Sequence, residues 1–226
     1  MHGKQTQNMK DENIHPIVRI LKKELDLGEM PIVSHLADSE RDPFVILMST
    51  LLSLRTKDEV TAVATDRLLA LAVTPDAMLK VPRSKIAKAI YPVGFYRNKA
   101  KTIHHVCREL IERFGSKVPD TLDDLLSLKG VGRKTANLVI TLAYGKEGIC
   151  VDTHVHRISN RLGYVKTKTP DETEMALRGK LPRKHWIIYN TLQVFFGRKI
   201  CKPVSPVCSA CPIRKYCDRV DVNRSR

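Results

Sequence analysis

Near its middle the chain carries a stretch with two glycines, which reads Leu128-Lys129-Gly130-Val131-Gly132-Arg133-Lys134-Thr135. Two glycines two positions apart allow a tight turn between a short predicted helix and a longer one. The backbone N–H groups that begin the second helix would point outward, and such a turn can hold a DNA phosphate without reading sequence. The alternative is an ordinary glycine turn between packed helices, because short glycine motifs recur by chance.

Helix signals dominate the rest of the chain. Asp42 before Pro43 is typical of a helix start, and the apolar run that follows, residues 44–52, predicts a helix buried on most sides. The same start signal recurs at Thr74 and Thr169. No segment shows the period-two alternation of a strand or an Asn-Gly hairpin turn, so the sequence predicts an all-α protein.

The length of 226 residues suits one or two domains. The most apolar stretch, residues 44–54, is about half as long as a membrane-spanning helix and contains three hydroxyl side chains, so we expect no membrane association. The first sixteen residues hold too few large apolar side chains for a secretory signal. The first dozen residues and the tail from Asp221 are polar, and we expect both to be frayed.

The charge of the chain indicates a polyanionic partner. Lysine and arginine number 39 against 24 acidic residues, a net charge of +15, and residues 181–226 hold ten basic residues against two acidic ones. Nucleic acid is the commonest partner of such a surface. Aromatic residues at 5% argue against stacking of many single-stranded bases and favour contact with a duplex backbone. A basic membrane-surface protein is the alternative, but no stretch pairs basic residues with a Trp- and Phe-rich face.

Four of the six cysteines are clustered, with the spacing Cys201-x6-Cys208-x2-Cys211-x5-Cys217. In a chain without a secretory signal such a cluster indicates a metal site rather than a disulfide scaffold. Structural zinc usually takes two short cysteine pairs, whereas only one C-x2-C pair is present here. Four thiolates also suit a 4Fe–4S cluster, so the spacing alone leaves both metals open.

Five segments between about Pro43 and Cys217 resemble those of the endonuclease III family of base-excision DNA glycosylases, in the family's order. The glycine stretch is similar to its helix–hairpin–helix, and the cysteine loop to its iron–sulfur loop. The other three segments are Val151-Asp152-Thr153-His154-Val155-His156-Arg157, Leu51-Leu52-Ser53 with Thr56-Lys57-Asp58, and Val93-Gly94-Phe95-Tyr96 with Lys99-Ala100.

The resemblance implies an all-α fold of two helical domains with a DNA cleft between them. Residues 36–146 would form a six-helix domain with the helix–hairpin–helix. Residues 1–35 would join residues 147–226 in a domain that carries a 4Fe–4S cluster on Cys201, Cys208, Cys211 and Cys217.

The implied activity is that of a bifunctional DNA glycosylase/AP lyase. It would remove damaged bases, oxidised pyrimidines above all, from duplex DNA through a lysine Schiff base. It would then cleave the strand 3′ to the abasic site by β-elimination. We expect a monomer that acts on double-stranded DNA, in the nucleoid-containing cytoplasm of a prokaryote or in the nucleus or mitochondrion of a eukaryote.

Lys134 and Asp152 are the catalytic residues that the resemblance implies. Lys134 would attack the sugar; a free lysine with a pKa of about 10.4 is mostly protonated, but a helix N-terminus and the neighbouring Arg133 would lower the pKa. Its alternative is a lysine that binds phosphate. Asp152 would stabilise the developing positive charge on the sugar, and its alternative is a simple helix N-cap.

Further residues are expected to contact DNA. They are Lys129, Gly130, Gly132 and Arg133 of the hairpin, with His154, Arg55 and Phe95. Arg55 stands where the family commonly has Gln, facing the base left unpaired, and an arginine is a good bidentate donor to guanine. Some thymine–guanine mismatch glycosylases also carry Arg here, but they lack the lysine. Phe95 matches the family's intercalating wedge, with a buried core residue as its alternative.

Three other functions remain open at this point. A mismatch glycosylase for thymine or uracil is favoured by Arg55 and opposed by Lys134. A non-enzymatic helix–hairpin–helix DNA-binding module explains the charge and the glycines but leaves Asp152 without a role. A zinc-stabilised nucleic-acid adaptor explains the four cysteines alone.

Overall fold

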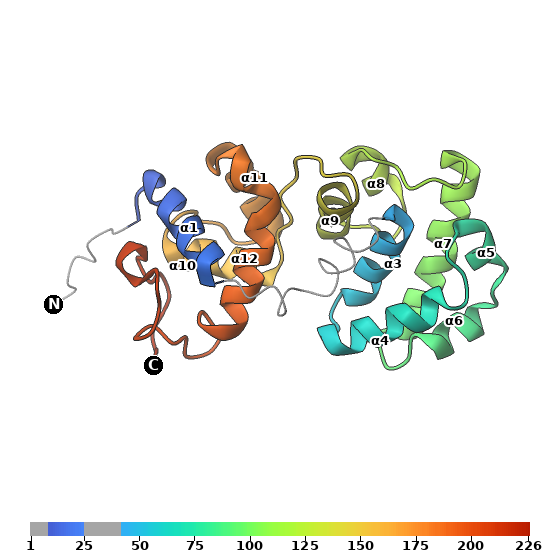
Figure 1. Cartoon of the computed structure of the whole chain (residues 1–226), viewed down its shortest axis with the longest axis horizontal. Helices are drawn as coiled ribbons and strands as arrows, with labels where there is room; N and C mark the ends of the chain where they lie inside the picture. The colour runs from blue at the N-terminus through green and yellow to red at the C-terminus, as the bar shows by residue number, and fades with distance from the viewer. Residues whose placement is uncertain (1–8, 25–41) are drawn as a thin grey trace. The chain divides into compact units, whose positions relative to one another are not determined.

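The computed structural model describes residues 9–24 and 42–226. In these two ranges all regular structure is helical and no strand is present, so the predicted all-α class is confirmed (Figure 1). The chain divides into two compact units, Met1–Met30 with Ile149–Arg226, and Pro31–Gly148. The units meet at residues 30 and 148, whereas the resemblance implied boundaries at residues 35 and 146. The boundary near residues 30–35 lies outside the described residues.

The unit formed by the middle of the chain contains seven α-helices in its described part. They are α3 (Pro43–Ser53), α4 (Asp58–Leu69), α5 (Pro75–Lys80), α6 (Arg83–Ala89), α7 (Tyr96–Phe114), α8 (Leu122–Ser127) and α9 (Arg133–Ala143). This is one more than the expected six. The segment between α4 and α7 forms two short helices because Pro82 lacks the N–H that a continuous helix would need.

Helix α3 is the centre of this unit. Its residues Phe44 to Leu52 are all buried, and α3 packs against α4, α7 and α9 (Figure 1). The sequence prediction of a helix buried on most sides is therefore confirmed. A helix surrounded in this way fixes the positions of the segments at both of its ends.

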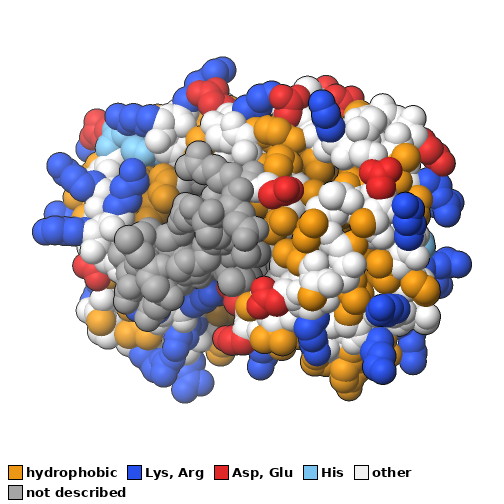
Figure 2. All heavy atoms as spheres, turned by 45° about the vertical axis from the view of Figure 1, so that its right-hand side comes forward, with side chains coloured by type: hydrophobic (Ala, Val, Ile, Leu, Met, Phe, Trp, Pro, Cys, Tyr) orange, Lys and Arg blue, Asp and Glu red, His pale blue; other side chains and the backbone are white. Residues whose placement is uncertain are grey.

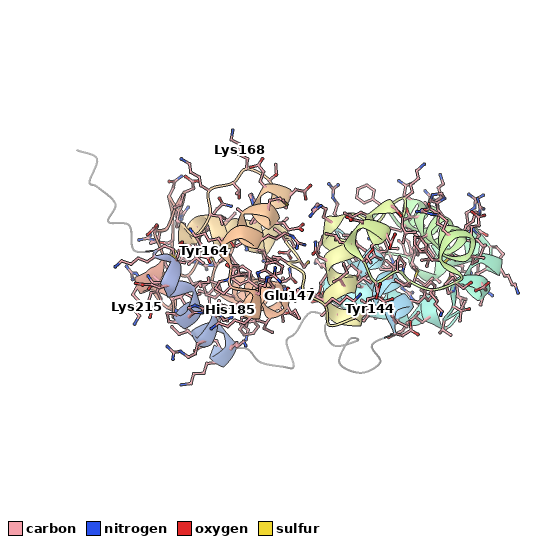
Figure 3. The ribbon with its side chains drawn as sticks, turned by 90° about the horizontal axis from the view of Figure 1, so that it is seen from above. Tyr144, Glu147, Tyr164, Lys168, His185 and Lys215 are labelled. Carbon is pink, nitrogen blue, oxygen red and sulfur yellow. The ribbon has the colours of Figure 1, made fainter. Side chains whose placement is uncertain are left out.

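The second unit is built from both ends of the chain. Its elements are η1 (Asp11–Asn13), α1 (Ile14–Glu24), α10 (Thr153–Leu162), α11 (Pro170–Lys180), η3 (Arg183–His185), α12 (Trp186–Lys199) and η4 (Arg214–Tyr216). Helix α12 packs against both α1 and α10. The buried Tyr164, which follows α10, donates a hydrogen bond to the carbonyl of Lys180 at 3.0 Å and joins α10 to α11 (Figure 3).

The predicted helix starts are confirmed by their caps. The Asp42 carboxylate accepts from the N–H of Phe44 at 2.7 Å and begins α3. Thr74 and Thr169 accept in the same way at the starts of α5 and α11. Each of these caps satisfies an N–H group that has no acceptor within its helix.

The polar ends of the chain are more ordered than expected in their described parts. Met9 is buried, and its N–H donates to the Asp218 carboxylate at 2.9 Å. The main chain of Arg226 exchanges hydrogen bonds of 2.9 Å with Pro206 and Ser209. The prediction of a frayed tail was wrong, because polar side chains do not reveal backbone hydrogen bonds. None of the described helices is long and apolar enough to cross a membrane.

Candidate nucleic-acid interface and cysteine loop

The predicted helix–hairpin–helix is formed by α8, residues 128–132 and α9. The hairpin is closed by a hydrogen bond of 3.0 Å from the N–H of Val131 to the carbonyl of Leu128. Gly130 has φ +98°, and a Cβ there would lie 2.5 Å from the methyl group of Thr102 on α7. Gly132 has an ordinary φ of −95°, and a Cβ there would meet no atom within 4 Å. Of these two positions, only position 130 therefore requires a glycine, because of its backbone conformation and its close contact with Thr102.

The N–H groups of the hairpin are not equally available to a phosphate. The N–H of Lys129 donates to the Glu109 carboxylate of α7 at 2.9 Å, which ties the hairpin to that helix. At the N-cap of α9, in contrast, Gly132 supplies no side-chain cap. The first N–H groups of a helix need acceptors from outside the helix, so the start of α9 is a candidate anion site.

Lys134 is the second residue of α9, and its side chain is half-buried. Arg133, also half-buried, precedes it as the first residue of the helix. A turn that held a DNA phosphate at the start of α9 would thus present the Lys134 amine beside that phosphate. The sequence prediction of a lysine in the first turn of this helix is confirmed, whereas its catalytic role stays a prediction.

Asp152 is the N-cap of α10. Its Oδ1 accepts from the N–H groups of His154 and Val155, both at 2.9 Å. Among the described residues none donates to Oδ2. The carboxylate therefore caps the helix with one oxygen and leaves the other for a further interaction, so the capping role and a catalytic role are compatible.

His154 is held within its own unit. Its Nδ1 lies 3.1 Å from Nη2 of Arg157. A Cβ at Gly197 of α12 would lie 2.4 Å from the same Nδ1 of His154. His154 is therefore packed closely against α12. Its expected contact with DNA stays a prediction.

Arg55 and Phe95 come from different segments and lie together. Both have left-handed backbones, with φ +54° and +58°, and Phe95 is 62% exposed. The guanidinium carbon of Arg55 is 5.8 Å from the centre of the Phe95 ring, a cation–π distance. The alternative of a buried core residue at position 95 was wrong, and the exposed ring is free to stack on a base.

The four clustered cysteines line one cavity. Cys201, Cys208, Cys211 and Cys217 all line it, together with apolar side chains such as Ile158 and Phe196. In the described part of the chain, no group of three or more His, Cys, Asp or Glu side chains is arranged to hold a metal ion. Four thiolates on one zinc ion at 2.3 Å would lie about 3.8 Å apart. Four cysteine thiolates are also the ligand set of a 4Fe–4S cluster, so the chemistry of the donors fits that group as well.

The surroundings of these thiols favour the binding of a positively charged metal centre. The pKa of Cys211 and that of Cys217 are raised to about 11, mainly by burial and to a smaller extent by the neighbouring thiols. Four neighbouring thiolates repel one another unless a positive centre lies among them. The remaining cysteines, Cys107 and Cys150, are buried elsewhere and do not line this cavity.

The sequence did not identify the residues that hold the cysteine loop. Arg161 of α10 donates to the carbonyls of Lys202 and Pro203, both at 2.7 Å, and lies 3.6 Å from Sγ of Cys201. Arg157, one turn earlier, donates to the carbonyl of Cys201 at 3.0 Å. The i, i+4 spacing of these two arginines on α10 was the available signal.

The basic residues beside the cysteines are at the surface. Lys215 of η4 is exposed, and Figure 3 shows its side chain on the outside of the unit. Lys199 is exposed as well, with its ammonium 4.7 Å from the centre of the Phe195 ring. On the face drawn in Figure 2, lysine and arginine side chains are scattered with acidic side chains among them, so this view shows no patch of one sign.

Comparisons with known proteins agree on one family. Residues 48–183 match the model of the HhH-GPD superfamily base excision DNA repair protein. The chain is similar to endonuclease III of Thermotoga maritima, with 48% identity over 179 residues that cover 79% of this chain and 84% of the relative. A solved non-covalent endonuclease III–DNA complex is 35% identical with a TM-score of 0.82, covering 92% of this chain and 95% of that one. A thermostable thymine-DNA glycosylase is 27% identical with a TM-score of 0.70, covering 82% and 91%.

We expect Gly130→Ala to destabilise the protein and weaken its binding to duplex DNA. Alanine on a left-handed backbone costs about 1–2 kcal/mol, and its methyl group would overlap Thr102. Denaturant unfolding and a DNA-binding titration measure the two effects. Gly132→Ala is the matched control and should leave the free energy of unfolding nearly unchanged. Equal destabilisation by both substitutions would contradict this account of the hairpin.

Proposed function

Since the chain belongs to the endonuclease III family of the HhH-GPD superfamily and is a DNA glycosylase/AP lyase, we propose that Lys134 and Asp152 perform its chemistry. The substrate would be double-stranded DNA with a damaged base, an oxidised pyrimidine above all, or with an abasic site. The protein would act on it as a monomer.

The proposed role of Lys134 follows from its place in the first turn of α9, and this observation carries the proposal. The hairpin and the N–H groups at the start of α9 would hold the phosphate backbone of the lesion strand. The neutral amine would then attack C1′ of the adjoining deoxyribose, and the bond from C1′ to the base would break as the base leaves. The nitrogen would then lose a proton, the C1′–O4′ bond would break so that the sugar ring opens with O4′ taking up a proton, and the nitrogen would remain double-bonded to C1′ as a protonated Schiff base.

The Schiff base would also account for cleavage of the strand. An iminium at C1′ makes the C2′ protons acidic, so a base can remove one of them. The electron pair then expels the 3′ phosphate by β-elimination, and the strand is cut 3′ to the abasic site. Lysine suits this step because a secondary amine is left after attack, whereas a hydroxyl could form no iminium.

Asp152 would stabilise the sugar while its bond to the base breaks. Its Oδ1 caps α10, and this fixes the carboxylate in one orientation. We propose that Oδ2 faces the positive charge that develops on the sugar ring and helps to deprotonate the attacking amine. Charge that is fixed before the reaction stabilises the transition state without reorganisation.

We also propose that Cys201, Cys208, Cys211 and Cys217 hold a 4Fe–4S cluster with a structural role. The cluster would supply a rigid centre for a loop that has little regular structure apart from η4. The chain's own part is to present four thiolates and to hold the loop with Arg157 and Arg161. Base excision itself requires no redox step.

For the cluster, we expect natively purified protein to be yellow-brown with about four iron atoms per chain and acid-labile sulfide. Cys211→Ser should lose colour and soluble yield together, because the cluster fills the cavity of the loop. Cys107→Ser is the matched control and should keep the iron content. Stoichiometric zinc in colourless, natively purified protein would refute the iron–sulfur assignment.

For the nucleophile, we expect Lys134→Ala to abolish borohydride trapping on abasic DNA while affinity for the abasic duplex stays nearly intact. Only the Schiff base is reduced to a stable link, and the main phosphate contacts would come from backbone N–H groups. Lys117→Ala, which removes an exposed lysine of the same unit, is the control. A wild-type trapping yield for Lys134→Ala would mean that another amine forms the Schiff base.

For the carboxylate, we expect Asp152→Asn to slow base removal by about 100-fold or more and to preserve the fold. Asparagine caps helices as well as aspartate does, but it carries no charge. Asp152→Ala should lose the cap as well, at a cost of about 1 kcal/mol in unfolding free energy. Single-turnover rates and thermal unfolding distinguish the two variants. A wild-type rate of base removal in Asp152→Asn would mean that Asp152 serves only as a helix cap.

A further inference from the structure

A buried lysine of α7 is not used by the mechanism above. Lys99 is 9% exposed, and its Nζ donates to the carbonyls of Leu52 at 2.7 Å and Leu54 at 2.6 Å and to Oγ1 of Thr56 at 3.1 Å. Burial lowers the pKa of Lys99 to about 8, so at pH 7 it is still mostly an ammonium. Its three N–H donors meet three acceptors. A lysine is almost never buried unless it is paired in this way.

The acceptors of Lys99 belong to the end of α3. Leu52 lies in the last turn of α3 and Leu54 is its C-cap, and carbonyls at a helix end have no N–H donor within the helix. A positive charge here also faces the negative end of the helix dipole. The ammonium therefore ends α3 and holds the chain that follows it, residues 54–57, against α7.

A second set of contacts joins this loop to the turn before α7. Oγ1 of Thr56 accepts the N–H of Gly94 at 3.3 Å in addition to the Lys99 ammonium. A Cβ at Gly94 would lie 2.7 Å from the carbonyl oxygen of Arg55, so the two backbones touch directly. The Arg55 loop and the turn of Phe95 are thus one assembly, and Lys99 is its buried anchor.

The assembly holds two exposed side chains in a costly backbone conformation. Arg55 and Phe95 are both non-glycine residues with positive φ, and the guanidinium of the first lies over the ring of the second. Left-handed non-glycine residues persist only where the surroundings fix them. The contacts from Lys99, Thr56 and Gly94 are the surroundings that fix this pair.

We propose that Lys99 is a positioning residue for specificity: by clamping the loop of residues 54–57 to the Phe95 turn, it aims Arg55 at the base opposite the lesion. This inference rests on the proposed role of Arg55. Lys99 itself touches no DNA and takes no part in the lyase step. Its loss should alter the preference for the opposite base more than the overall rate.

Lys99→Met tests the inference. Its side chain has a similar length but no charge or donor. Single-turnover nicking is measured on abasic sites opposite each of the four bases. We expect the ratio of the rates opposite guanine and adenine to change by about 5-fold or more, and to match the ratio for Arg55→Ala. In the double variant, Lys99→Met should add no further change to that ratio. Lys101→Met, an exposed lysine of the same helix, controls for the loss of one charge.

Limited trypsin digestion measures, in the absence of DNA, how firmly the loop of residues 54–57 is held. Cleavage after Arg55, identified by mass spectrometry, should be faster in Lys99→Met than in the wild type and in Lys101→Met. A wild-type cleavage rate together with a wild-type ratio would overturn the inference. A change in ratio that persists in full beside Arg55→Ala would overturn it too, because Lys99 would then act through another residue.

Two further outcomes are decisive. Should Lys99→Met fail to fold, Thr56→Val removes one acceptor of the ammonium from a partly exposed position. A shifted ratio in Thr56→Val supports the clamp, and a wild-type ratio overturns it. A wild-type ratio in Arg55→Ala would overturn the role of Arg55 and this inference together. Failure of the lyase proposal is distinct, since it would appear as lost borohydride trapping in the wild-type protein.

Discussion

Helix α10 begins at the Asp152 carboxylate, and the cysteine loop of the same unit is held by arginines of that helix. Asp152 begins α10 by accepting two backbone N–H groups. One and two turns further along, Arg157 and Arg161 hold the carbonyls of the cysteine loop. The proposed catalytic group and the proposed cluster loop are therefore attached to the two ends of one short, rigid element.

This arrangement explains why the cysteine loop needs so little secondary structure of its own. Backbone carbonyls in an irregular loop must find donors, and two guanidinium groups supply several each. The cavity lined by the four thiols is thereby defined from α10 as well as from the loop. The loop is hydrogen-bonded to α10 although about 40 residues separate the two in the chain.

The sequence could predict what is local. The starts of α3, α5 and α11 could be predicted from Asp42, Thr74 and Thr169, because a cap and a following proline act within one turn. The hairpin was found because glycine requirements are also local, although only the structure separates Gly130 from Gly132. Lys99 could not be read as buried, since its three acceptors lie 43 to 47 residues away. Likewise Arg161 showed its spacing on a helix but not its partners.

The unit built from both chain ends has a consequence for how the protein is made. Residues 42–148 follow one another without interruption and can fold as soon as they leave the ribosome. Helix α1 is synthesised earlier but must wait for α12, and Met9 bonds to a residue 209 positions later. Until then the apolar face of Ile14, Ile17 and Leu21 has no partner from its own unit. The apolar side chains of this 11-residue segment therefore stay unburied until α12 has been synthesised, because so short a segment is not stable as an isolated helix in water.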